Sequence, residues 1–367
     1  MHFSILRRYN INVTHEIFPV NESGVWIKRL PKPACIRAQS WPDDSRPLVS
    51  ISCITFNHEP FIRDCLDSFL TQETDFPVEV LIHDDASTDQ TPSVIREYEA
   101  RYPHIIKPIY QVQNQYSQGK KPNLDFNFPR AKGKYIATCE GDDYWTDPSK
   151  LQLQVDFLDN NPDFVMCFHD AKATDRTGNV LAESLLRADR KRDYSADDLK
   201  KAPWVPTPTR CFRNVVNAYP DEISKVLNGD AFFTAVLGYY GKGKYLGEIR
   251  PAVYRKHEAG IWSGLDADKR ALESFNSRLY MYQYHTRTGG QEFALEFLFD
   301  VVFPYFMKLY PDRNPFQALL RHQKGIQDRQ RREIREIRNS HAFRLGAALL
   351  WPLKRLRRVL DRFTAKG

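Results

Sequence analysis

Short apolar runs alternate with helical stripes along the first half of the chain. Leu48–Thr55, Val78–Ile82 and Tyr135–Cys139 are apolar or β-branched runs of strand length, which are typical of buried strands. After the first run, apolar residues recur along one face of a helix, at positions 61, 62, 65, 66, 69 and 70. Other segments extend the alternation: strand-like runs at 105–112 and 164–168, and helical patterns at 91–102, 124–132 and 147–158. This alternation predicts an α/β fold in which helices flank a parallel sheet.

The rest of the chain follows a weaker pattern. Residues 171–200 are polar and charged, so we predict a mobile loop there. A strand-like run covers Tyr245–Tyr254, and residues 268–310 follow a helical pattern that is rich in Tyr and Phe. Residues 1–47 hold scattered aromatics and prolines without a catalytic motif, and we interpret them as a β-rich flap or a partly ordered arm. We divide the chain into an N-terminal extension (1–47), an α/β domain (48–267), a helical part (268–320) and a tail (321–367).

Carboxylates follow the strand-like run Tyr135–Cys139 directly. Glu140, Asp142 and Asp143 surround one glycine at the point where this run ends. Such a group can hold a hard divalent cation, which takes oxygen ligands, although an acidic turn exposed to solvent would look the same. In open α/β sheets, ligands bind at the carboxyl ends of the strands. The sequence therefore indicates a ligand site at this edge of the sheet.

Two other candidates lie later in the chain and are ambiguous by themselves. Asp230 follows Asn228-Gly229 and precedes an apolar helix, where a helix cap would need no further role. His257 follows a strand-like run, and a lone histidine in such a place is more often structural than functional.

Four segments together resemble the motifs of family 2 glycosyltransferases: Val49–Asn57, Glu79–Asp89, Gly133–Asp143 and Tyr254–His257. The resemblance covers roughly residues 48–265. It implies a GT-A fold, a Rossmann-like mixed sheet that binds a nucleotide sugar, with helices on the sheet, to which the pattern of the C-terminal residues adds a helical tail. It also implies a nucleotide-sugar donor, a divalent metal (Mg²⁺ or Mn²⁺) and transfer with inversion to a hydroxyl acceptor.

The resemblance also implies roles for the nucleotide and the metal. Residues at the ends of the first two strands would contact the nucleotide: Thr55, Asn57, Asp84 and Asp85, the last of which would read the base. Asp142 would contact the ribose or a metal-bound water, and Asp143 would ligate the metal directly. His257 would contact the metal or the diphosphate, and other phosphate candidates are Arg255, Lys256 and the Gly260–Gly264 loop.

The general base of an inverting transfer would be Asp230 by the same resemblance, because one carboxylate must take the proton of the acceptor. Glu222 and Asp221 are the reserves. The chain departs from the family pattern at His83, which we interpret as structural. It also has Glu140-Gly-Asp-Asp where the family has a strict Asp-x-Asp, so the division of roles among these carboxylates stays open.

Charge is unevenly distributed between the body and the tail. The chain has a formal net charge of +7, but residues 321–367 hold fourteen Lys/Arg and four Asp/Glu, which leaves the first 320 residues at about −3. From Leu345 the apolar positions recur every three or four residues among arginines, which predicts a basic amphipathic helix. It is either a cationic face packed on the core or a contact to an anionic membrane surface. Nucleic acid is not an expected partner, because no base-reading module is visible.

Further composition features set the expected location. No apolar run approaches the ~18 residues of a membrane span, and the start lacks the apolar core of a signal peptide. None of the six cysteines forms a Cys-x-x-Cys pair, which suits free thiols in a reducing cytosol. We therefore expect a cytoplasmic protein, peripheral on the inner face of the cell membrane.

We interpret the chain as a glycosyltransferase of bacterial surface polysaccharide or lipopolysaccharide synthesis, with a saccharide or lipid-linked saccharide as acceptor. One alternative is a nucleotidyltransferase, but that class would show a Gly-rich phosphate loop after the first strand, where this chain has Thr55-Phe-Asn-His-Glu59. The other is a non-catalytic sugar- or nucleic-acid-binding protein on a related fold.

Overall fold

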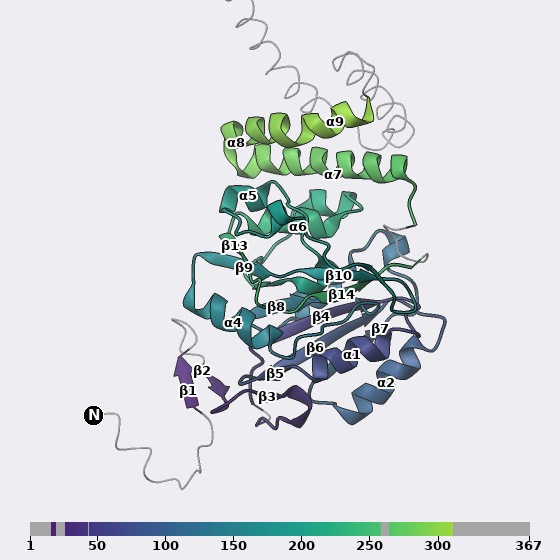
Figure 1. Ribbon diagram of the computed structural model, residues 1–367, viewed down its shortest axis with the longest axis vertical. Coiled ribbons are helices and arrows are strands. Elements are labelled where there is room, and N and C mark those ends of the chain that lie inside the picture. The colour runs from purple at the N-terminus through teal and green to yellow at the C-terminus, as the bar shows by residue number, and fades with distance from the viewer. Residues whose placement is uncertain (1–15, 20–25, 43, 258–263, 311–367) are drawn as a thin grey trace, which may run out of the picture. The chain divides into compact units, whose positions relative to one another are not determined.

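The computed structural model describes residues 16–19, 26–42, 44–257 and 264–310 (Figure 1). The described residues fall into two compact units, and the boundaries divide the chain into Met1–Tyr219 with Gly229–Gly264 and Pro220–Asn228 with Leu265–Gly367. Each unit buries apolar side chains of its own, such as Val80 in the first and Phe297 in the second. The division of the chain at residues 47, 267 and 320 stays a prediction.

A seven-stranded sheet forms the middle of the first unit, in the order β13-β9-β12-β8-β4-β6-β7. Its strands are β4 (Val49–Thr55), β6 (Val78–Asp84), β7 (Ile106–Tyr110), β8 (Tyr135–Thr138), β9 (Phe164–Phe168), β12 (Cys211–Arg213) and β13 (Lys242–Tyr245). Only β12 runs antiparallel to its neighbours β8 and β9 in the described part of this sheet, and the other pairs are parallel. The expected mixed α/β sheet is therefore confirmed, and β12 corrects the purely parallel sheet that the alternation alone predicted.

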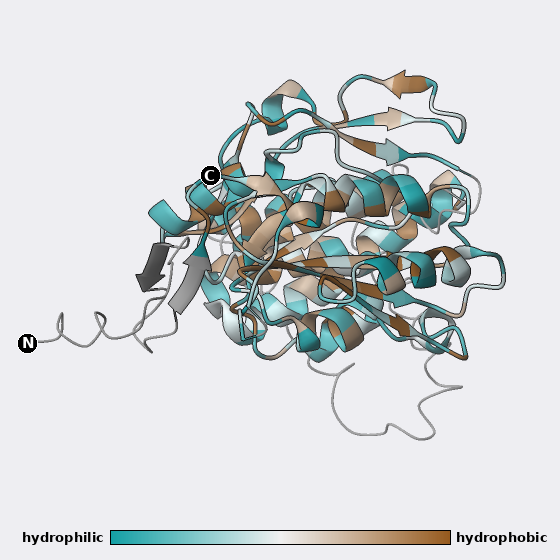
Figure 2. Ribbon diagram, turned by 90° about the horizontal axis from the view of Figure 1, so that it is seen from below, coloured by the Kyte–Doolittle hydropathy of each residue, from teal (hydrophilic) through white to brown (hydrophobic). Residues whose placement is uncertain are grey.

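Helices follow the strands along the chain, as the alternation predicts. They are α1 (Ile62–Leu70), α2 (Thr91–Arg101), a π-helical turn (Asn123–Asn127) with α3 (Phe128–Arg130), α4 (Lys150–Asn160) and α6 (Gly229–Leu237). The predicted apolar face of α1 is buried in the core, with Ile62, Leu66 and Phe69 at zero exposure. Figure 2 shows hydrophobic colouring along the strands in the middle of the sheet and mixed colouring on the helices.

The register of the sheet brings the predicted ligand-binding strand ends together. Thr55 at the end of β4 pairs with Asp84 at the end of β6, and Ser52 pairs with Thr138 at the end of β8. Beyond β8 the backbone continues beside β4, where the amide of Gly141 donates to the carbonyl of Ile54 at 2.9 Å. The three strand ends therefore share one edge of the sheet.

The prediction of a mobile loop at residues 171–200 is wrong. This stretch contains β10 (Ala171–Thr174), β11 (Val180–Ala182) and the short helix α5 (Ala196–Lys200). β10 pairs in parallel with the distant β14 (Ala252–Arg255), and together with β11 they form a three-stranded sheet. The polar composition gave no sign of this sheet, because its pairing depends on a strand far along the chain.

The single strand predicted at Tyr245–Tyr254 is also wrong. The chain forms two strands there, β13 and β14, which belong to different sheets. The segment between them contains Gly247 and Pro251, and proline cannot donate a hydrogen bond to a strand partner. Ending one strand and starting another places His257 just beyond the end of β14.

The remaining elements are short strands near the N-terminus and the helices of the second unit. They are β1 (Glu16–Pro19) paired with β2 (Trp26–Arg29), β3 (Ala34–Cys35) paired with β5 (Glu73–Thr74), and α7 (Ala267–Thr288), α8 (Gly290–Phe297), a π-helical turn (Leu298–Val302) and α9 (Phe303–Leu309). The helical prediction for residues 268–310 is thus confirmed as far as residue 309. All six cysteines are free, as predicted.

The basic amphipathic tail lies outside the described residues, so its helix stays a prediction. Within the described ranges, no helix is long and apolar enough to cross a membrane.

Candidate functional site

Three carboxylates gather where the chain leaves β8. Glu140, Asp142 and Asp143 each offer an oxygen, and these atoms lie within 4.8 Å of one another. Asp143 is only 1% exposed, and its Oδ1 accepts a hydrogen bond from the amide of Arg255 at 2.9 Å. Asp143 Oδ2 and Asp142 Oδ1 are buried and have no hydrogen-bond partner among the described residues. Because buried acceptors are normally satisfied, these oxygens are candidates for binding a ligand.

The crowding of negative charge shifts the titration of the cluster. Burial, followed by repulsion from Asp142 and Glu140, raises the pKa of Asp143 well above its usual value. Burial and the charges of Asp142 and Asp230 raise the pKa of Glu140 to about 8. A bound cation would relieve this repulsion, since an ion is often the largest charge in such a site. The buried, unpartnered oxygens of these carboxylates, together with the imidazoles described next, therefore fit a divalent metal.

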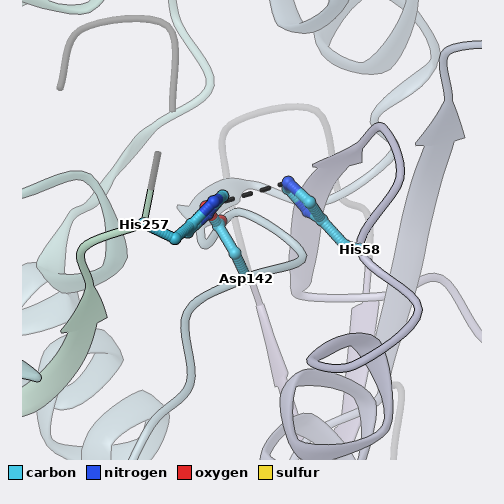
Figure 3. A group of neighbouring side chains, drawn as sticks. All are labelled: His58, Asp142 and His257. Atoms are coloured by element: carbon cyan, nitrogen blue, oxygen red, sulfur yellow. Dashed lines mark hydrogen bonds and ion pairs between the residues drawn. The ribbon is translucent and has the colours of Figure 1, made fainter. Parts of the chain in front are cut away.

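Two histidines face Asp142, as Figure 3 shows. His257 Nε2 lies 2.9 Å from Asp142 Oδ2, and His58 Nε2 lies 3.8 Å from the same oxygen. The two imidazole rings are 5.9 Å apart and nearly perpendicular, at 88°. Burial opposes ionisation of Asp142, but the neighbouring imidazoles hold the pKa of its carboxyl below the usual value. The expected approach of His257 to the acidic cluster is therefore present in the structure.

His58 was not among the predicted site residues. The available signal was its place just after the first strand, at the edge where ligands of such sheets bind. Gly141 allows the acidic turn, residues Glu140–Asp143, to pass close to His58, since a Cβ at Gly141 would lie 2.7 Å from Thr55 Oγ1 and 3.0 Å from His58 Nδ1. Burial is the main effect that lowers the pKa of His58, which favours the neutral imidazole.

The strand β14 positions His257 and Arg255 against the acidic turn. Tyr144 and Val253 exchange backbone hydrogen bonds of 3.2 and 2.9 Å, so the acidic turn and β14 are joined. The guanidinium of Arg255 donates to the carbonyl of Asp142 at 3.0 Å and to the carboxylate of Asp64. Because these groups already occupy Arg255, the structure favours a supporting role for it over the phosphate contact that we expected.

The other expected phosphate contacts are Lys256 and the Gly260–Gly264 loop. Lys256 is exposed next to this position, and its amide donates to Thr174 at 2.8 Å. In the Gly260–Gly264 loop, residues 260–263 lie outside the described residues.

Asp84 and Asp85 differ sharply although they are adjacent. Both oxygens of Asp85 accept backbone hydrogen bonds, from Gln115 at 2.7 Å and Tyr116 at 3.0 Å, so this carboxylate holds the loop after β7. Asp84 Oδ1 is buried without a partner in the described chain, and burial raises the pKa of this carboxyl. Of the two, Asp84 therefore keeps the open acceptor, whereas the resemblance pointed to Asp85.

The other expected nucleotide contacts are Thr55 and Asn57. Thr55 is 3% exposed, and its hydroxyl has no partner within the described residues. Asn57 has a positive φ of 55°, and its side-chain oxygen accepts from the amide of Thr88 at 2.8 Å. Buried His83 lies 3.3 Å from Asp85 and packs on Phe126, which agrees with a structural role.

Asp230 lies in the first turn of α6, and its side chain is 45% exposed. Arg210, which is buried, donates to its carboxylate at 3.3 Å and to its backbone carbonyl at 3.1 Å. The charge of Asp230 contributes to the raised pKa values of Glu140 and Tyr254, so Asp230 belongs to the same electrostatic group as the acidic turn. Arg210 was missed by sequence reasoning, and nothing in its sequence context singled it out.

The reserve candidates belong to the second unit. Glu222 accepts hydrogen bonds from Arg287 at 3.0 and 3.2 Å, and Asp221 lies in the same short 3-10 segment.

A family model and two curated relatives match parts of the chain. Residues 50–215 match the family model described as glycosyl transferase family 2. An uncharacterized protein of Mycobacterium tuberculosis is 37% identical over 254 residues, which is 69% of this chain and 68% of that protein. A Bacillus subtilis protein named as a teichuronic acid biosynthesis glycosyltransferase is 32% identical over 113 residues, 31% of this chain and 42% of that protein.

Among solved structures, a mannosyltransferase of Pyrobaculum calidifontis in complex with GDP-Man and Mn²⁺ is similar, with a TM-score of 0.48. It is 18% identical over 86% of this chain and 91% of that one.

Proposed function

The chain belongs to glycosyltransferase family 2, and we propose that it moves a sugar from a nucleoside-diphosphate sugar to a hydroxyl acceptor with inversion. The observation that most supports this proposal is the convergence of the Glu140–Asp143 carboxylates, His257 and Asp230 at the carboxyl edge of the sheet. An inverting transfer needs two such features, which are a place for the leaving diphosphate and a carboxylate for the acceptor proton.

The acidic turn and His257 would hold a divalent cation. The unpartnered oxygens of Asp142 and Asp143 are the acceptors available for it among the described residues. When bound, Mg²⁺ or Mn²⁺ supplies Lewis-acid stabilisation of the charge that develops on the leaving diphosphate. Arg255 supports this arrangement by fixing Asp143 through its amide and the acidic turn through its guanidinium.

The nucleotide would lie along the ends of β4 and β6. Thr55 and Asp84 both present buried side-chain oxygens there without a partner in the described chain. A carboxylate at this position can accept an N–H of a pyrimidine or guanine ring. Asp85 and Asn57 would act mainly by holding the two loops that border this position.

Asp230 would be the general base. Arg210 donates to both the backbone carbonyl and the carboxylate of Asp230, which limits the positions that the carboxylate can take. The exposed face of Asp230 leaves room for an acceptor hydroxyl, and a positioned carboxylate can take its proton during attack.

The relatives and the charge distribution support a proposal for the pathway and for the location. The similarity to a teichuronic acid biosynthesis glycosyltransferase supports a role in bacterial surface polysaccharide or lipopolysaccharide synthesis, with a saccharide or lipid-linked saccharide as acceptor. The net charge of +10 on residues 321–367 supports attachment to the anionic inner face of the cell membrane from the cytoplasm. The family assignment disfavours a nucleotidyltransferase, and the intact carboxylates disfavour a non-catalytic binding protein.

A screen of nucleotide sugars tests the proposal. We expect one donor to raise the melting temperature in the presence of Mn²⁺ or Mg²⁺ and to be hydrolysed slowly in a metal-dependent way. Asp143→Asn keeps the shape but removes a charge, so hydrolysis should fall by orders of magnitude. Asp189→Asn, at an exposed carboxylate that pairs with Arg187, is the matched control.

Full activity of both Asp143→Asn and the chelator-treated wild type would contradict the metal role. If no nucleotide sugar stabilises the protein or is hydrolysed, the donor class is wrong.

A further inference from the structure

We propose that His58 is a metal ligand, and that His58, Asp142 and His257 together form a site that prefers first-row transition metals such as Mn²⁺ to Mg²⁺. The inference rests on the proposed function only in that the metal serves sugar transfer. The site itself follows from the positions of these three side chains (Figure 3).

The three side chains come from separate parts of the chain and meet at one oxygen. His58 follows β4, Asp142 follows β8 and His257 follows β14. The Nε2 atoms of His257 and His58 lie 2.9 and 3.8 Å from Asp142 Oδ2. Ligand atoms at ~2.1 Å from a shared metal are at most ~4.2 Å apart, so both separations are compatible with one ion.

Open acceptors around the cluster point independently to a ligand. Asp142 Oδ1 and Asp143 Oδ2 are buried without a hydrogen-bond partner among the described residues, and Asp143 is 1% exposed. His58 Nδ1 is also buried without a partner in that part of the chain. The nitrogen that faces the cluster is His58 Nε2, and its 3.8 Å separation from Asp142 Oδ2 is too long for a hydrogen bond, so a direct bond between these side chains does not account for their approach.

Asp142 is better placed than Asp143 to be the shared carboxylate. Both imidazoles face Asp142, whereas Asp143 Oδ1 is occupied by the amide of Arg255. Asp143 would then either hold the site in place without contacting the metal or provide Oδ2 as a further ligand. The resemblance had suggested Asp143 as the direct ligand and Asp142 as the contact to ribose or water.

The composition of the site determines its metal preference. Mg²⁺ binds oxygen ligands and keeps most of its waters, whereas imidazole nitrogen suits transition metals. Two imidazoles with one carboxylate leave positions open for diphosphate oxygens. Each imidazole favours a transition metal over Mg²⁺, so His58 adds to the preference that His257 already gives the site.

Metal binding to the full chain without donor tests the inference. Mn²⁺ alone is titrated into the metal-free wild type, His58→Gln and the matched control His104→Gln, with free Mn²⁺ measured by electron paramagnetic resonance. Mg²⁺ affinity is measured by competition with Mn²⁺. His104 is exposed after α2, so its replacement makes the same chemical change away from the site.

We expect His58→Gln to weaken Mn²⁺ binding by about tenfold or more, because even residues that only hold a metal ligand in place change metal affinity by this much. Mg²⁺ binding should change by less than about threefold, so the Mn²⁺/Mg²⁺ preference falls. Pulsed spectra of bound Mn²⁺ should show two coupled nitrogens in the wild type and in His104→Gln, and one in His58→Gln.

A wild-type spectrum with only one coupled nitrogen overturns the inference, whether or not the variant folds. An unchanged Mn²⁺ affinity in a folded His58→Gln overturns it as well. Two coupled nitrogens in a chain that turns over no nucleotide sugar would support this site and contradict the proposed function. If the wild type transfers sugar but its bound Mn²⁺ shows a single coupled nitrogen, the proposed function is supported and this site is contradicted.

Discussion

At the scale of single residues, neighbours in the sequence have different surroundings in the structure. Asp143 contacts a backbone amide and is almost fully buried, whereas Asp142 faces two imidazoles. Asp85 is saturated by backbone amides, whereas Asp84 keeps an open oxygen among the described groups. Pairs of adjacent carboxylates are therefore not interchangeable here, and their roles depend on what the fold places against each.

Asp230→Asn separates a catalytic role from a structural one. If Asp230 is the general base, the transfer rate should fall by about a hundredfold or more, since asparagine cannot take the proton. Donor affinity should stay near that of the wild type, because the base does not contact the nucleotide. As a helix cap, asparagine replaces aspartate with little loss, so the structural role predicts a nearly unchanged rate.

Transfer rate and donor dissociation constant are measured on Asp230→Asn and on Glu222→Gln. A normal rate in the first and a large loss in the second would move the base to Glu222.

Lys150 at the start of α4 makes unfolding depend on pH. It is fully buried, its ammonium donates to Gln154 at 2.7 Å, and it lies 4.1 Å from the centre of the Trp145 ring. Burial lowers the pKa of Lys150 from 10.5 to about 8. The charges of the neighbouring Cys139, Cys167 and Cys211 act in the opposite direction and raise the pKa of Lys150. The buried His169 also interacts with the Lys150 charge, which lowers the pKa of that imidazole.

Between these two pKa values the unfolded chain binds more protons at Lys150 than the folded one, so stability rises with pH in this window. From pH 7 to pH 10 the wild type should gain ~2 kcal/mol relative to Lys150→Met, in which the effects of other titrating groups cancel. Urea unfolding of both proteins at each pH measures the difference. Parallel curves would show that Lys150 titrates normally.

At the scale of elements, Asp170 organises the segment that we predicted to be mobile. Its carboxylate accepts the amides of Ala171, Leu185 and Leu186 at 2.8, 3.2 and 3.0 Å. It also pairs with Lys191 at 2.8 Å. One buried carboxylate thus holds the beginning of β10 and the chain that follows β11.

Asp170→Ala should release this segment, because several buried donors lose their acceptor at once. We expect a loss of about 3 kcal/mol or more in the free energy of unfolding and faster cleavage by trypsin after Arg187, Arg190 and Lys191. Asp189→Ala, at an exposed carboxylate of the same segment, is the control and should change stability little. Equal cleavage of the two variants would argue against the role of Asp170.

At the scale of the whole molecule, charge is segregated along the chain. Residues 321–367 carry a net charge of +10 while the rest is slightly acidic. This asymmetry favours an anionic surface as the partner of the tail, which lies apart from the catalytic residues in sequence.

Replacing Arg355, Arg357 and Arg358 with glutamine in the full chain should weaken binding to vesicles that contain anionic lipid. At roughly 1 kcal/mol for each basic residue, the loss is about a hundredfold in partitioning. Sedimentation with vesicles measures it, and binding of the wild type should weaken with salt. The control replaces three exposed arginines of the body, Arg63, Arg176 and Arg187. If both triple variants sediment equally, the tail does not bind the membrane by charge.

The sequence by itself determined the elements of the sheet and the edge at which the site lies. Alternating apolar runs and stripes depend on local periodicity, so β4, β6, β8 and α1 follow from the pattern. Because neighbouring parallel strands end at the same edge of a sheet, the sequence predicts that the carboxylates at the ends of β6 and β8 lie near each other.

Tertiary structure alone decided which side chains meet. The pairing of β10 with β14 and the antiparallel insertion of β12 are long-range contacts that local periodicity does not encode. The same is true of His58, which reaches Asp142 because β4 and β8 are neighbours in the sheet, and of His257, which β14 brings to the same oxygen. Periodicity reports which face of an element is buried, whereas the partners on that face depend on how distant strands come together.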